Sequence, residues 1–351
     1  MSTSRSLTLS RILLICALLV GLCGLNGSAL AATSSTPAPA ANSATFGIGP
    51  ATATRLDPHR GVLNYEVQPG ARLTDHVALV NLATKPVTLA VYTADGLNNR
   101  DGSIGYQPQA TPGDGARTWI TVDTKDHRRA VTVPARGLVI VPISLDVPSN
   151  ASPGDHIAAV VASITSAVDS SGRTHANLEQ RVALRTFFRV SGDLTPQLSI
   201  EGLHASYHGT LNPFGSGSVT VTYTVRNTGN VLLGGRQRVT VTGLFGSTGS
   251  LKALADVPVL LQGSSYPVRV LVPEVWPEIF MHATVSVTPE SVAGAANPPL
   301  KVARAETSFF AVPWTLLGLI LVLLALIVGG WLWRRAHPRV ARHRPPSGGS
   351  K

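Results

Sequence analysis

The sequence predicts an all-β protein in which two consecutive immunoglobulin-like β-sandwiches precede a single C-terminal transmembrane helix. Three observations support this fold class. Short runs of alternating apolar and polar residues recur from residue 46 to residue 310, Gly, Pro, Asn and Asp separate them, and a long apolar stretch without charge follows. Because alternation places one face of a strand in a core, many such strands at about ten-residue spacing indicate antiparallel sandwiches.

The N-terminal residues 1–31 have the composition of a secretory signal peptide. Arg5 and Arg11 precede an apolar run, and the segment 29–31 matches the small-residue pattern at which signal peptidase cleaves. Residues 32–45 are small and include prolines, so they are expected to form a flexible leader.

The two cysteines, Cys16 and Cys23, both lie in the predicted signal peptide. A lipoprotein role for Cys23 would need a small residue before it, where Leu22 stands. The mature chain is therefore expected to have neither disulfides nor thiolate metal ligands, and its stability must come from packed cores.

The first sandwich is predicted over residues 46–192. Alternating positions recur in this range, as in Val87, Leu89 and Val91, and turn pairs such as Asp101-Gly102 fall between the runs. The same Asp-Gly segment resembles a calcium loop, but the ligand register of such a loop would fall on Leu97 and Pro108. A hairpin turn is the expected structure.

The second sandwich is predicted over residues 193–310. Its clearest strand alternates Val219, Val221, Tyr223 and Val225 with polar residues and runs into a turn at 227–230. A similar order of strand, Asn-initiated turn and returning strand occurs in the first domain after Val77, which indicates a faint internal correspondence between the two domains.

The stretch 311–333 carries no charge and is long enough, at about 1.5 Å per residue, to cross a hydrocarbon layer of about 30 Å. The predicted anchor places tryptophans at both ends of the span and arginines immediately after it: Trp314, Trp331, Trp333, Arg334 and Arg335. Because basic residues favour the cytoplasmic side, the tail 334–351 is expected inside the cell and both sandwiches outside the plasma membrane.

The net charge of +10 does not indicate nucleic-acid binding. Arg5 and Arg11 contribute +2, the tail from Arg334 to Lys351 contributes +6, and the remaining chain carries +2. The basic composition is thus explained by membrane topology, and no nucleic-acid partner is expected.

Several short segments of the first predicted domain form a distinctive set: 46–50, 65–70, 80–81 with 85–88, 101–106, and 147–148 with 153–156. These segments resemble the first domain of the WxL-interacting surface proteins, and the stretch 197–288 is more loosely similar to the second domain of that family. The composition looks like that of an actinobacterial member. The order of signal peptide, two sandwiches, span and basic tail agrees as well. The Trp314-Thr315-Leu316 triplet lies in the span, where its position near the interface explains it.

In that family the first domain binds peptidoglycan and the second binds partner or host proteins. The resemblance therefore implies a membrane-anchored, non-catalytic binding protein for peptidoglycan or another cell-wall component, for surface proteins, or for both. A structural role, as an accessory subunit of a membrane complex, is the alternative. An enzyme is not expected, because the sequence has neither a nucleophile elbow nor a Ser-x-x-Lys arrangement, and no pair of acids is singled out by its spacing.

No metal or cofactor is expected. His204 and His208 are close in sequence, but on a strand they would stand about 13 Å apart at about 3.3 Å per residue. The candidate ligand-binding residues are aromatic: Tyr92, Tyr106, Trp119 and Trp276. For Tyr106 and Trp119 a place in the core is the favoured alternative, whereas Pro273 and Pro277 favour an exposed loop for Trp276.

Overall fold

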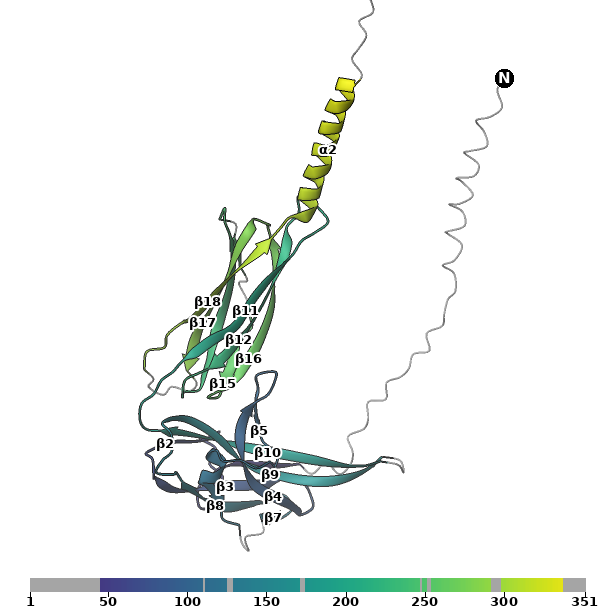
Figure 1. Cartoon of the computed structure of the whole chain (residues 1–351). Coiled ribbons are helices and arrows are strands. Elements are labelled where there is room, and N and C mark those ends of the chain that lie inside the picture. Colours follow the sequence, from purple (N-terminus) through teal and green to yellow (C-terminus); the bar gives the residue numbers. More distant parts are fainter. Residues whose placement is uncertain are drawn as a thin grey trace, which may run out of the picture. The chain divides into compact units, whose positions relative to one another are not determined.

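The computed structural model describes residues 45–109, 111–124, 129–170, 174–246, 248–250, 254–291 and 298–336. All of them belong to the unit Ala44–Lys351. Figure 1 labels its strands and its C-terminal helix. The predicted signal peptide, nearly all of the predicted leader and the tail beyond Ala336 lie outside the described residues.

In the described part of the chain, the first sandwich is formed by strands β1 to β10 in two sheets. One sheet has the strand order β1-β3-β8-β6, and the other has the order β2-β10-β9-β4-β5 with β7 also paired to β4. The strands are β1 (Phe46–Ala51), β2 (Leu63–Val67), β3 (Arg72–Asn81), β4 (Val87–Asn98), β5 (Ile104–Tyr106), β6 (Ile120–Val122), β7 (Ala130–Val133), β8 (Leu138–Asp146), β9 (Gly154–Ser170) and β10 (Thr174–Val190).

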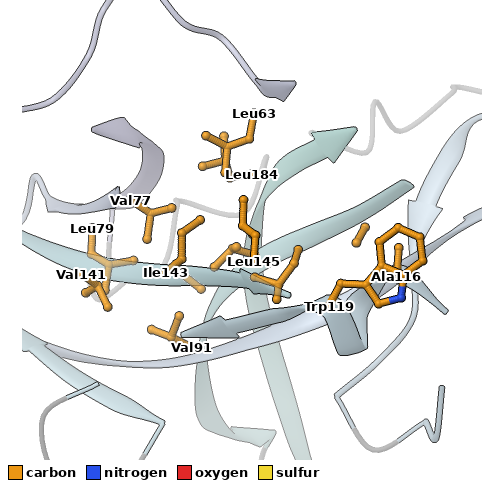
Figure 2. Packing of buried hydrophobic residues seen from close by; sticks show 14 of the residues in the cluster. Leu63, Val77, Leu79, Val91, Ala116, Trp119, Val141, Ile143, Leu145 and Leu184 are labelled. Carbon is orange, nitrogen blue, oxygen red and sulfur yellow. The ribbon is translucent and has the colours of Figure 1, made fainter. Parts of the chain in front are cut away.

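Alternation along these strands builds the first core, as the sequence predicts. Val87, Leu89 and Val91 of β4 are buried together with Ile143 and Leu145 of the opposite sheet. Figure 2 shows side chains from both sheets meeting in this core, with Trp119 at one end. Trp119 ends a short 3-10 helix, η1 (Ala116–Trp119).

One strand pair differs from the predicted antiparallel arrangement. β10 pairs with β2 in parallel, with Phe188 opposite Tyr65. Both pairing modes show the same alternation of buried and exposed residues, so the sequence pattern does not distinguish them. The chain also runs through most of the first sandwich between these two strands, and local turn signals therefore give no information about their pairing.

The second sandwich is formed, within the described residues, by a sheet of order β11-β12-β16 and a sheet of order β14-β13-β17-β18, with β15 also paired to β13. The predicted alternation in β12 is confirmed, since its Val219, Val221, Tyr223 and Val225 are all buried. The strands are β11 (Leu198–His208), β12 (Gly217–Asn227), β13 (Leu233–Gly243), β14 (Thr248–Ser250), β15 (Val257–Leu260), β16 (Ser265–Val275), β17 (Ile279–Ser291) and β18 (Ala303–Ala311). The predicted fold class is confirmed.

The two sandwiches share one pairing scheme. In the first, β3 pairs with β8 and β1, while β4 pairs with β7 and β9. In the second, β12 pairs with β16 and β11, while β13 pairs with β15 and β17. The faint correspondence in sequence therefore extends to most of the strands.

A buried asparagine holds the same turn in each repeat. The Asn81 side-chain amide donates to the Lys85 carbonyl at 2.8 Å, and Asn227 donates to the Val231 carbonyl at 2.8 Å. Each amide also donates to a carbonyl of the short strand that follows, Val133 in β7 or Leu260 in β15, at 3.2 and 2.9 Å. Both side chains are fully buried, so these bonds satisfy groups that would otherwise be costly to desolvate.

The C-terminal helix α2 spans Trp314–Ala336 and is long and apolar enough to cross a membrane. It begins three residues later than the predicted span, because Ala311 still pairs with Ile279 of β17 and Pro313 accepts the first helical bond, from Leu317 N–H. The side chains of the 18-residue apolar window are not buried against the rest of the chain.

Candidate functional site

The predicted ligand-binding aromatics lie in three different environments. Tyr92 and Tyr106 pack together on the outer face of the β4-β9-β10 sheet of the first sandwich, where Tyr92 is only 3% exposed and Tyr106 is half-buried. Trp119 lies in the first core, only 7% exposed, with its ring 5.3 Å from Phe188 and 4.8 Å from His156. Trp276, 55% exposed, stands between β16 and β17 in the second sandwich. The structure therefore brings together two of the four residues.

The outer face around the two tyrosines is a mixed aromatic and charged surface. Tyr106 Oη accepts a hydrogen bond from Arg185 Nε at 3.0 Å, and Tyr92 Oη donates to Glu179 Oε1 at 3.4 Å. Small side chains, Ala94, Ala159 and Val161, form the floor between them. We call the set Tyr92, Tyr106, Glu179, Arg181 and Arg185 the outer-face patch.

The electrostatics of the outer-face patch keep both tyrosines neutral. Burial raises the pKa of Tyr106, although the hydrogen bond from Arg185 opposes that shift. Burial likewise raises the pKa of Tyr92, against the effect of Arg181. Each phenol thus remains a donor or acceptor of hydrogen bonds rather than a phenolate. The signal that the sequence offered for this patch was the alternation of Arg181, Ala183 and Arg185 along β10, opposite in phase to the buried Leu184.

A second polar cluster fixes the loop after β1. Arg60 donates to both Asp57 and Asp75, at 2.8 and 2.6 Å, and Tyr65 Oη donates to Asp75 at 2.6 Å. Burial alone would raise the pKa of Asp75, but the hydrogen bonds from Arg60, Tyr65 and the His76 N–H lower it. A carboxylate that is ionised and already accepts several donors is a poor general base, so this cluster is structural.

Two turn motifs from different sandwiches meet at the junction of the domains. The Asp155 N–H donates to the Asn230 carbonyl at 2.8 Å, and the Asn230 side chain donates to the Pro153 carbonyl at 2.9 Å. Asp155 also accepts from the Leu232 N–H at 2.9 Å while Arg189 holds its carboxylate with bonds of 2.6 and 2.7 Å. The sequence predicts a turn at 227–230, but local turn residues do not indicate which distant segment that turn contacts.

The β4–β5 hairpin makes a second set of bonds across the junction. The Asn98 side chain donates to the Val259 carbonyl at 2.7 Å and accepts from the Leu261 N–H at 2.8 Å. Gly102, at the tip, has a φ of 83° and approaches Pro258 so closely that a Cβ would lie 2.2 Å from its ring. The Asp-Gly segment that resembles a calcium loop is thus a hairpin that binds the second sandwich.

A polar cavity of about 290 Å³ lies beside this junction, lined by residues that include Asp95, Gln107, Asp155, His156 and Gln262. The Arg117 N–H donates to Asp95 Oδ1 at 2.7 Å, and Gln107 Oε1 is buried without a hydrogen-bond partner. Among the described residues no group of three or more His, Cys, Asp or Glu side chains is placed to hold a metal ion. The cavity offers oxygen acceptors to a small hydrogen-bond donor.

The anchor residues flank the apolar helix at its two ends. Trp314 begins α2 and is 76% exposed, while Trp331 and Trp333 lie in its last turns. The Arg335 guanidinium stands 3.9 Å from the centre of the Trp331 ring, a cation–π geometry. Arg334 and Arg335 lie in the last turn of the helix, where their charges mark the end of the apolar segment. This arrangement is consistent with a membrane anchor.

No protein-family model matches the sequence, and no curated protein matches it. Several solved structures are similar in fold. The class 5 fimbriae chaperone CfaA is 11% identical and covers 77% of this chain and 100% of its own, with a TM-score of 0.34. The structure of the Salmonella enterica SafA pilin in complex with the SafB chaperone is 10% identical, covers 76% of this chain and 98% of the matched chain, and has a TM-score of 0.31. The Pseudomonas aeruginosa CupB2 chaperone is 12% identical, covers 72% of this chain and 99% of its own, and has a TM-score of 0.28.

Proposed function

We propose that this protein is a non-catalytic binding protein of the cell surface, anchored in the plasma membrane by α2, whose first sandwich binds cell-wall peptidoglycan. The observation that carries the proposal is the outer-face patch. On one surface of the first sandwich it places the half-buried Tyr106 ring beside the guanidinium groups of Arg181 and Arg185, while the buried Tyr92 packs behind Tyr106.

The chemistry of the patch suits a wall polymer. Guanidinium groups bind carboxylates through paired hydrogen bonds, and tyrosine offers an apolar ring with a polar tip. Peptidoglycan presents both carboxylates and sugar rings. The Tyr106–Arg185 hydrogen bond holds the donor in place before binding, which lowers the entropic cost of forming the complex. The resemblance to WxL-interacting surface proteins supports the same role.

Sedimentation with purified peptidoglycan tests the proposal. The detergent-solubilised full chain is expected to sediment with the polymer, and Arg185→Gln is expected to weaken the apparent affinity about tenfold, the effect of losing one central contact. Arg236→Gln is the matched control, because Arg236 is an exposed arginine that pairs with Glu290 in the second sandwich. It is expected to bind as the wild type does.

Equal binding by both variants and the wild type would contradict a role for the outer-face patch. Absence of wall affinity together with co-purification of membrane proteins would favour the alternative, an accessory subunit of a membrane complex. Release of soluble wall fragments during the assay would contradict both non-catalytic roles.

A further inference from the structure

Large apolar side chains are exposed at the end of the second sandwich from which α2 begins. Leu211 is 93% exposed, Phe245 83% and Phe310 70%. Among the described residues outside α2, every exposed Phe or Trp side chain lies at this end. We call this surface the loop end; its exposed residues are Leu211, Phe214, Leu244, Phe245, Trp276, Ile279 and Phe310.

Strand pairing places these residues together. Gly217, which follows the β11–β12 loop, pairs with Val275, directly before Trp276. In the other sheet, Gly243 pairs with Met281 and Ile279 pairs with Ala311. A hydrogen bond of 2.5 Å from the Phe245 N–H to Glu278 connects the β13–β14 and β16–β17 loops.

The start of α2 is part of the same surface. Two residues, Val312 and Pro313, separate β18 from the helix, and the Thr315 hydroxyl donates to the Thr210 carbonyl at 3.4 Å. A cavity of about 270 Å³ is lined by Leu211, Pro277 and Trp314 among others. Figure 1 shows α2 continuing from β18 at this end of the second sandwich.

The loop end has almost no charge. In the segments 209–216, 244–246 and 276–279, Glu278 is the one ionisable residue of the sequence, and it accepts the bond from Phe245. An exposed apolar surface of this kind needs a partner, because monomeric proteins seldom leave large contiguous apolar patches in water.

We propose that the loop end is a membrane-contact surface, on which Leu211, Phe245 and Trp276 enter the interfacial layer of the leaflet from which α2 emerges. The proposal rests on α2 spanning the bilayer, as in the proposed function. The three Cα-to-Cα steps from Ala311 to Trp314 span at most about 10 Å, so the loops lie close to the start of the apolar span. Trp and Phe side chains favour that layer.

Site-directed spin labelling of the full chain tests the proposal. Single cysteines are introduced at Leu211→Cys, Phe245→Cys and Trp276→Cys in a Cys16→Ser/Cys23→Ser background, and the chain is reconstituted in nanodiscs of phosphatidylcholine and phosphatidylglycerol. Collision with oxygen, which concentrates in lipid, is compared with collision with a water-soluble nickel chelate. The matched control is Val302→Cys, an apolar position that is 52% exposed at the opposite end of β18.

The oxygen-to-nickel ratio is expected to be severalfold higher at the three loop positions than at Val302. Loop labels as accessible to nickel as the Val302 label would overturn the proposal. Labels shielded from both reagents would overturn it in favour of a protein partner, and spin–spin broadening would identify that partner as a second copy of the chain. A label at Leu324→Cys, in the middle of α2, separates failure of the membrane-contact proposal from failure of the proposed membrane anchor. If this label is accessible to nickel, α2 does not span the bilayer and the membrane anchor is refuted.

Discussion

At the scale of single residues, Asn81 and Asn227 each hold a turn that an alternating sequence pattern cannot specify. Each side chain donates two or more hydrogen bonds to backbone carbonyls and accepts one from the N–H two residues later, at 2.9 Å for Asn81 and 3.1 Å for Asn227. Asparagine fits this position because a single amide supplies both the donors and the acceptor.

We expect Asn227→Ala to destabilise the second sandwich by about 2–4 kcal/mol, because it leaves the Val231 and Leu260 carbonyls buried without their donor. Thermal unfolding followed by circular dichroism should show a midpoint lowered by about 5–10 °C. Asn64→Ala is the control, since Asn64 is exposed on β2. A midpoint equal for both variants would mean that the buried amide does not hold the turn.

Asp75 should make the stability of the first sandwich depend on pH. Its pKa is lowered in the fold, because hydrogen bonds from Arg60, Tyr65 and the His76 N–H outweigh the effect of burial. The ionised form therefore stabilises the fold above the unfolded-chain pKa of about 3.9, and this contribution is lost as the pH falls through the folded value.

We expect Asp75→Asn to lower the unfolding midpoint at neutral pH, and the difference from the wild type to shrink between about pH 5 and about pH 2. Asp146→Asn serves as control, because the Asp146–Arg72 pair is largely exposed and such pairs contribute little. A difference that stayed constant down to the lowest pH would refute the role of the Asp75 carboxylate.

At the scale of elements, the β4–β5 hairpin was predictable and its role was not. An Asp-Gly pair between apolar runs predicts a tight turn, and the structure has one. Its contact with the second sandwich depends on Asn98 and Gly102, which are far in sequence from Val259 and Pro258. Local patterns carry no information on such distant pairs.

We expect Gly102→Ala to disrupt the hairpin contact, because a Cβ at this position would lie 2.2 Å from the Pro258 ring. Limited proteolysis should cut the β4–β5 loop faster in this variant, by about tenfold if the contact contributes about 1.4 kcal/mol. Gly263→Ala is a close control: its φ of 74° imposes similar backbone strain, but nothing lies within 4 Å of the added Cβ. Equal cleavage of the loop in both variants would show that the contact is not needed to protect the hairpin.

At the scale of the whole molecule, α2 and its flanking residues predict how the chain would be oriented in a membrane. The helix carries Trp314 at one end and Arg334 with Arg335 at the other. Because arginines favour the cytoplasmic side, both sandwiches are predicted to face outward.

Protease treatment of protoplasts checks this orientation. We expect both sandwiches to be digested from outside while an epitope tag placed after Lys351 remains intact until the membrane is permeabilised. Digestion of the tag in intact protoplasts would reverse the predicted topology. A cytoplasmic tag on a separate protein reports whether the membrane stayed closed.

The repeated pairing scheme also belongs to the whole molecule, and the sequence revealed little of it. The similarity between the segments around Asn81 and Asn227 is short, whereas the structure matches β3, β4, β7, β8 and β9 with β12, β13, β15, β16 and β17. Strand pairing depends on backbone hydrogen bonds and on the total volume of the side chains in the core. Because many different sequences can fill the same core volume, the same pairing occurs in both sandwiches although their side chains differ.

The fold class, the apolar span and the turns could be predicted from local sequence patterns, because alternation, uninterrupted apolarity and turn residues act over a few neighbouring residues. The packing of the sheets brings Tyr92 and Tyr106 together, buries Trp119 in the core, and places the loop that contains Trp276 and Pro277 at the end of the second sandwich from which α2 begins. These relations depend on which strands pair and how their faces pack, and residues far apart in the chain meet only after both sandwiches have formed.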